Sequence, residues 1–211
     1  MTSSSIGRRF VLSTVVASTL GLSGCFGLAV TGAAVGTMAM LDRRSIGAQT
    51  DDQAIELKGL RELNAAINDG ATGSVSITSF NRRVLLSGQV DSAATRQRAE
   101  EVVRTKVPNI RDIYNELELG IPTAFATRAK DTTLTARVRA NLVRERNLAS
   151  NAIKVVTEQS TVYLMGLVLP DEAERASIIA SQVSGVTRVV TLFEMISPED
   201  LQRIQGPDPK K

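Results

Sequence analysis

The sequence contains no histidine and a single cysteine among its 211 residues. Without histidine there is no imidazole for general acid–base catalysis or for binding a transition metal. One thiol can form neither an internal disulfide nor a zinc site built from several cysteines. Tryptophan is absent and aromatic residues make up only 3% of the chain, which argues against a deep aromatic-lined ligand pocket.

Catalytic patterns are lacking as well. The chain shows no nucleophile–base pair, no paired carboxylates for acid–base work and no phosphate-binding glycine loop. We therefore expect a protein that is not an enzyme, with no cofactor and no metal. A hydrolase ranks third among the possible classes, and turnover abolished by a single substitution would revive it.

The charge balance is close to neutral. Lysine and arginine exceed aspartate and glutamate by 25 to 22, and Arg8 and Arg9 lie in a segment that we expect to be removed. Nucleic acid binding is disfavoured, and a basic function would have to come from local clustering.

The N-terminus is typical of an export signal. Met1–Arg9 is polar and basic, and Phe10–Leu22 is uncharged and mostly apolar. The next residues, Leu22-Ser23-Gly24-Cys25, resemble the bacterial lipobox, which implies a signal peptide over residues 1–24 and acylation (palmitate) of Cys25. The alternative is one transmembrane anchor over Phe10–Leu41, weakened by its five glycines. The adjacent arginines also weakly resemble a twin-arginine signal, and the ordinary secretory route is the alternative.

Acylation at Cys25 would anchor the chain stably, since two or more acyl chains are enough for that. The following residue is Phe26, whereas an Asp there would resemble an inner-membrane retention signal. The sequence therefore favours the outer membrane, with the protein facing the periplasm.

Beyond residue 51 the chain repeats one pattern twice. Each copy shows a helical repeat, two alternating strand-like runs joined by a short polar turn, a second helix and a closing strand. The pattern predicts an α+β fold of two tandem αββαβ domains, each with two amphipathic helices on one face of a small sheet. We expect Asp51 or Asp52 to cap the first helix and Asp171 to cap the last one.

These patterns divide the chain into five segments. After the signal peptide over 1–24, the acylated Cys25 begins a flexible tether. The predicted segments are 25–50 for the tether, 51–120 for the first domain, 128–197 for the second and 198–211 for a polar C-terminal tail.

The repeated motifs are similar to those of the BON family. The similarity lies in three features of each copy: a hairpin, the helix after it and the run that leads into the closing strand. The hairpins are Val84-Leu85-Leu86-Ser87-Gly88 and Val162-Tyr163-Leu164-Met165-Gly166, and the runs are Pro108–Asn115 and Gly185–Thr191. The closing strands are expected over Tyr114–Leu119 and Val190–Glu194.

A lipobox followed by two such domains resembles the dual-BON outer-membrane lipoproteins. The resemblance implies binding of anionic phospholipid, maintenance of outer-membrane integrity, a role near the cell-division site and influence on the β-barrel assembly machinery. It places lipid contact on a helix of the second domain.

The first helix of the second domain carries the local basic cluster. Its expected phospholipid-binding residues combine an apolar stripe with flanking arginines: Leu134, Arg137, Val138, Arg139, Leu142 and Arg144. This combination suits an anionic membrane surface. The alternative is that the apolar stripe is the core face of the helix, with solvated arginines outside. Thr133 stands where related chains can carry an aromatic residue.

Gly88 and Gly166 occupy equivalent hairpin positions, where a close approach of neighbouring backbone is the expected reason for glycine. A second functional hypothesis is a periplasmic protein–protein adaptor that docks an envelope or β-barrel assembly machine through its sheet edges. In that case lipid contact would be incidental.

Overall fold

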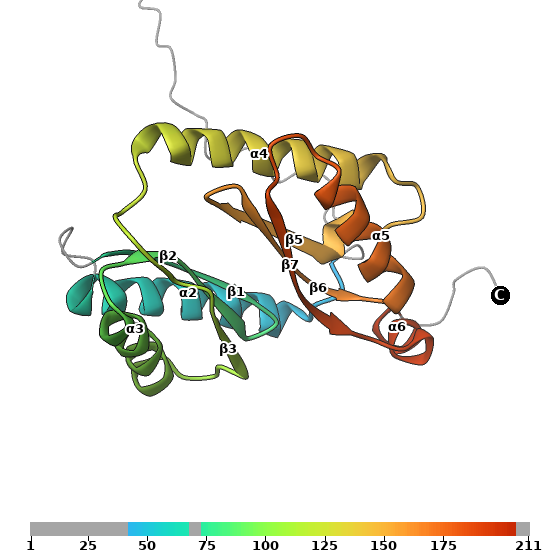
Figure 1. Ribbon diagram of the computed structural model, residues 1–211. Helices are drawn as coiled ribbons and strands as arrows, with labels where there is room; N and C mark the ends of the chain where they lie inside the picture. Colours follow the sequence, from blue (N-terminus) through green and yellow to red (C-terminus); the bar gives the residue numbers. More distant parts are fainter. Residues whose placement is uncertain (1–41, 68–72, 206–211) are drawn as a thin grey trace, which may run out of the picture.

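The computed structural model describes residues 42–67 and 73–205. It confirms two α+β units in tandem, each with the order αββαβ (Figure 1). The first unit consists of α2 (Ile46–Ala66), β1 (Gly73–Phe80), β2 (Arg83–Val90), α3 (Ala93–Lys106), β3 (Asp112–Asn115) and β4 (Glu118–Leu119). The second consists of α4 (Phe125–Arg144), the 3-10 turn η1 (Ser150–Ala152), β5 (Ile153–Glu158), β6 (Thr161–Val168), α5 (Pro170–Ser181) and β7 (Arg188–Met195), and α6 (Pro198–Gln205) follows it.

The predicted signal peptide, Cys25 and most of the tether lie outside the described residues. In the parts of the chain that are described, no helix has the length and the hydropathy needed to cross a membrane.

Each sheet is organised around its second strand. In the first domain β2 pairs antiparallel with β1 and parallel with β3 and β4. In the second domain β6 pairs antiparallel with β5 and parallel with β7. The predicted continuous strand Tyr114–Leu119 is instead interrupted between β3 and β4, where Leu117 turns into the core and is 2% exposed.

The molecule has four layers, because the two sheets pack against each other and the helices lie outside (Figure 1). Alternate residues of β2 and β6 point to opposite sides, so each central strand contributes to two apolar clusters. Val84 and Leu86 face α2 and α3, whereas Leu85 faces the other domain. Tyr163 lies in this contact between the sheets, and burial there raises the pKa of its hydroxyl to about 12.

Four helix boundaries differ from the sequence prediction, one of them the start of α4 at Phe125 instead of residue 128. α2 begins at Ile46 in the predicted tether, with the hydroxyl of Ser45 accepting the Ala48 N–H at 3.1 Å, so neither Asp51 nor Asp52 is its cap. α5 begins at Pro170, which leaves Asp171 inside the first turn. The predicted polar tail contains α6. Ser45 caps α2, Pro170 occupies the first turn of α5, and the Ser197 hydroxyl accepts the Asp200 N–H at the start of α6.

Asp52 holds the hairpin of the first domain. Its carboxylate accepts the backbone N–H groups of Asn81 and Arg82, both at 2.7 Å. These two residues have positive φ angles of 52° and 63°, the conformation of a two-residue turn between twisted strands. Asp131 of α4 does the same for Gln159 and Ser160 at 2.9 Å. The repeated aspartate thus stabilises a turn that lacks glycine.

The two hairpin glycines lie against neighbouring backbone. A Cβ atom on Gly88 would stand 2.1 Å from the carbonyl oxygen of Ser74, and Gly88 has a φ of 123°. A Cβ atom on Gly166 would stand 2.5 Å from the carbonyl oxygen of Ala152. Larger residues at either position would push the paired strands apart.

Arg43 joins the end of the tether to the second domain. Its guanidinium donates to both carboxylate oxygens of Glu172 in α5, at 2.6 and 2.8 Å, and to the carbonyl oxygen of Leu167 at 2.9 Å. Both side chains of the ion pair are buried, with 5% and 8% exposed. Three residues later the chain enters α2 of the first domain, so this ion pair connects the two domains.

The environment of Glu172 favours its charged form. Burial alone would raise its pKa, but the hydrogen bonds from Arg43 and from the Leu169 N–H outweigh it and lower the pKa. A lowered pKa contributes stability that is present above the ordinary glutamate value of 4.5 and is lost as the pH falls through the folded-state pKa.

We predict that Arg43→Ala lowers the free energy of unfolding by about 3 kcal/mol at neutral pH, because it leaves the Glu172 carboxylate buried without its cation. Urea unfolding followed by circular dichroism measures this change. The matched control is Arg61→Ala, whose side chain is 78% exposed and whose loss should change stability by less than about 0.5 kcal/mol. The difference in free energy of unfolding between wild type and Arg43→Ala should become smaller below pH 4.5. Equal effects of the two substitutions would contradict the role given to Arg43.

Candidate lipid-binding surface

α4 covers the outer side of the second sheet, away from the first domain (Figure 1). It uses one face for the core: Leu134, Val138 and Leu142 are 3%, 0% and 1% exposed and pack onto β5, β6 and α5. The three apolar residues expected to bind phospholipid therefore do not qualify as lipid contacts in this fold. The alternative that the sequence left open, a core face, describes them.

A second and weaker apolar stripe runs along the opposite side of α4. Its members recur at intervals of three or four residues, which places them on one face. We call it the outer stripe, and it consists of Phe125, Ala129, Thr132, Ala136, Ala140 and Val143. All six side chains are exposed. Phe125 and Val143, one at each end of the helix, are 78% and 66% exposed.

Basic residues flank the outer stripe on both sides. Helical geometry places Arg128 and Arg139 along one flank, and Lys130, Arg137 and Arg144 along the other. The one acidic residue of α4, Asp131, is 4% exposed and holds the hairpin turn. The exposed surface of this helix therefore carries five cations and no carboxylate.

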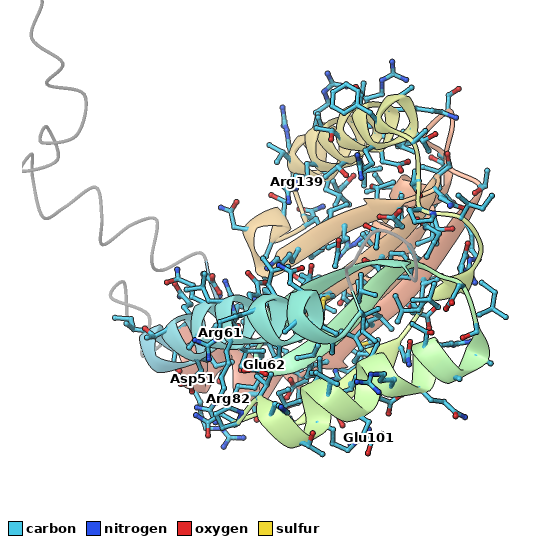
Figure 2. The ribbon with its side chains drawn as sticks, turned by 90° about the vertical axis from the view of Figure 1, so that its left-hand side faces the viewer. Asp51, Arg61, Glu62, Arg82, Glu101 and Arg139 are labelled. Atoms are coloured by element: carbon cyan, nitrogen blue, oxygen red, sulfur yellow. The ribbon has the colours of Figure 1, made fainter. Side chains whose placement is uncertain are left out.

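These five cations have no acidic partners among the residues that the structure describes. Elsewhere in those ranges arginine and lysine commonly pair with carboxylates, as Arg104 does with Glu100 at 2.6 Å. On α4, Arg139 donates to the carbonyl oxygen of Val155 at 3.2 Å, and Figure 2 labels it on the side of α4 toward the sheet. Arg144 donates to the side-chain oxygen of Asn141 at 3.2 Å. No carboxylate of the described residues therefore neutralises the positive charge of this helix.

An apolar stripe between two basic rows is the pattern of a helix that lies flat in a membrane interface. Phe125 would be the apolar anchor of that pattern, and the cations suit phosphate groups. Phe125 lies outside the second domain as predicted from the sequence, which starts at residue 128, and Thr133 was the position compared with an aromatic residue of related chains. The signal that could have found Phe125 is its spacing of eighteen residues from Val143, five helical turns.

Within residues 42–67 and 73–205, no group of three or more His, Cys, Asp or Glu side chains could hold a metal ion. Of the predicted site residues, Arg137, Arg139 and Arg144 are exposed on the flanks of α4, Arg139 on the flank toward β5, and all three are separated from the buried apolar residues.

Comparison with known proteins identifies the class. The family model of the BON domain matches residues 51–120 and 130–196. The chain belongs to the BON-domain family and contains two BON domains. It is 31% identical to the "Outer membrane lipoprotein DolP" of Haemophilus influenzae over 185 residues, covering 88% of this chain and 95% of that one. It is thus a dual-BON protein similar to DolP.

Two further relatives share part of the chain. The "21 kDa hemolysin" of Actinobacillus pleuropneumoniae is 25% identical, with 74% of this chain and 80% of that protein covered. The "Osmotically-inducible protein Y" of Escherichia coli is 29% identical, with 68% and 72% covered.

We predict that Leu142→Ala lowers the free energy of unfolding by about 2–5 kcal/mol, because it opens a cavity under α4. The neighbouring substitution Val143→Ala removes an exposed side chain and should change stability by less than about 0.5 kcal/mol. Thermal and urea unfolding of both variants measure the difference. Similar losses at the two positions would contradict the assignment of core and outer faces.

Proposed function

We propose that the chain is an outer-membrane lipoprotein, acylated at Cys25 and facing the periplasm, that binds anionic phospholipid through the second BON domain and supports outer-membrane integrity. The printed name of the Haemophilus relative supports the location and the class. The observation that carries the lipid-binding part is the exposed surface of α4, where five cations that pair with no carboxylate of the described residues flank an exposed apolar stripe.

The expected binding energies favour recognition of a lipid surface, rather than anchoring of the protein, as the role of α4. A basic residue near anionic headgroups contributes about 1 kcal/mol, and burial of Phe125 would add about 1.5–3 kcal/mol. An affinity of this size is reversible and sensitive to salt. Acyl chains on Cys25 would hold the protein on the membrane, and α4 would select the lipid surface that it meets.

A protein–protein adaptor is the second candidate, and a groove on the first domain favours it. The groove lies between α2 and β1 with a volume of about 490 Å³, and Leu57, Leu60 and Ile77 form its apolar lining. Leu57 is 73% exposed. The adjoining edge of β1 is partly closed, because Ser79 donates to Glu56 and accepts from Lys154. A partner such as the β-barrel assembly machinery would therefore dock through the groove more easily than through the strand edge.

We predict that a non-acylated chain starting at Asp42 binds vesicles containing phosphatidylglycerol or cardiolipin, and binds purely zwitterionic vesicles far less. This start keeps Arg43, all of α2 and the three apolar clusters. Arg137→Glu/Arg139→Glu should weaken the binding by about tenfold or more. Flotation at low and high salt, with circular dichroism to verify folding, provides the measurement.

The matched control is Lys58→Glu/Arg98→Glu, which makes the same charge change at exposed positions on helices of the first domain. It should leave binding within about twofold of wild type. Unchanged binding of the folded Arg137→Glu/Arg139→Glu variant would refute the assignment to α4. If wild type binds no vesicles, Cys25 would account for all membrane attachment, and a pull-down from envelope membranes would then test the adaptor function.

We also predict that Phe125→Trp reports insertion. The chain has no tryptophan, so this variant carries a single indole at an exposed position. Its emission should shift to the blue with anionic vesicles and be quenched by brominated acyl chains, because the ring enters the interface. The companion variant is Thr132→Trp, in the middle of the outer stripe. It tests whether the whole stripe contacts the membrane. Emission at position 125 that stays unchanged when the protein floats with vesicles would exclude Phe125 as the anchor.

A further inference from the structure

One flank of the outer stripe opens into a groove between α4 and the turn after α5. The groove has a volume of about 290 Å³ and contains Arg137, Asn141 and Arg144 from α4 together with Gln182 and Ser184 from the turn. It is smaller than the pockets that hold drug-sized ligands. The volume suits a small polar group.

The lining is rich in hydrogen-bond donors and contains no carboxylate. Arg137 and Arg144 lie two helical turns apart on the same side, with Asn141 between them. The side-chain oxygen of Asn141 accepts a hydrogen bond from Arg144 at 3.2 Å. The NH₂ group of Asn141 can therefore donate to another acceptor. Gln182 and Ser184 are exposed and add an amide and a hydroxyl. Guanidinium groups with amide and hydroxyl donors are the usual recognition set for a phosphate group.

The ends of the two helices reduce this positive potential without reversing it. The groove lies near the C-terminal ends of α4 and α5, each equivalent to roughly half a negative charge. At the end of α5, the carbonyl oxygens of Ile178 and Ala180 are occupied by the N–H groups of Gln182 and Val183. Two full guanidinium charges exceed the two partial charges, so an anion remains favoured.

We propose that this groove seats the phosphate of one phospholipid headgroup, an inference that rests on the proposed function of α4. The groove includes Ala140, which is also a member of the outer stripe. When Arg137 and Arg144 hold the phosphate of a lipid, the acyl chains of that lipid therefore lie beside the apolar residues of the outer stripe. The site binds a lipid at a defined position, in addition to the diffuse attraction of the basic helix.

Two charge-matched double variants of the chain starting at Asp42 distinguish binding of a phosphate in the groove from diffuse electrostatic attraction to the helix. Arg137→Gln/Arg144→Gln removes two cations from the groove, whereas Arg128→Gln/Lys130→Gln removes two cations from the other end of the same helix. A seat predicts that the first pair loses roughly tenfold more affinity for anionic vesicles than the second, because charge-assisted hydrogen bonds are lost as well as charge. Equal losses would overturn the seat and leave the lipid-binding face in place.

A second comparison leaves α4 unchanged. Ser184→Glu places a carboxylate at the groove, where it can occupy the arginines, and Ser181→Glu adds the same charge at the exposed end of α5 outside this lining. We expect the first to weaken vesicle binding roughly tenfold more than the second. Indistinguishable effects of the two variants would overturn the seat.

Soluble probes identify the source of the phosphate. The deacylated headgroup glycerophosphoglycerol should shift the side-chain amide resonances of Asn141 and Gln182 and compete with vesicles, and inorganic phosphate should compete less well. Competition by inorganic phosphate at lower concentration than by the headgroup would overturn the assignment to a lipid. If wild type fails to bind anionic vesicles, the proposed function itself falls, and that result differs from equal losses in the paired variants.

Discussion

Phe80, Leu85, Tyr163 and Met165 meet between the two sheets, and the position of every other element follows from this contact. The central strands β2 and β6 carry apolar residues on both faces, so a sheet covered by helices on one side still needs a partner on the other. The other domain supplies that partner. The helices are thereby forced to the outside, and α4 is left with one face on its own core and the opposite face toward solvent (Figure 1).

Hydrophobic periodicity is sufficient to predict the αββαβ repeat, because each core is built from residues that alternate along one strand or recur along one helix. The contact between the sheets is harder to predict. The continuous apolar run Val84-Leu85-Leu86 indicates a strand buried on both faces, but it does not say what covers the second face. The proposed lipid-binding face of α4 is hard to predict for a related reason. Leu134, Val138 and Leu142 dominate the pattern, whereas the outer stripe consists largely of alanine and threonine.

The polar residues were the least predictable, since their roles depend on partners far away in the sequence. Local rules assign Asp52 to a helix cap, yet its carboxylate binds the turn at Asn81 and Arg82. Arg43 lies in a segment that reads as a flexible tether, but its partner Glu172 is 129 residues away. A buried ion pair of this kind can be found only once the fold brings the two charges together.

The Arg43 ion pair also affects how the proposed lipid-binding face is positioned relative to the tether. In the sequence the first domain stands between the tether and the second domain. In space, Arg43 attaches the end of the tether to α5, which packs beside α4. A membrane anchor at Cys25 would therefore lead directly to the domain that carries the unpaired cations. Five positive charges on one helix repel each other and reduce stability, and none of them pairs with a carboxylate of the described residues. The proposed binding to an anionic surface would offset this repulsion.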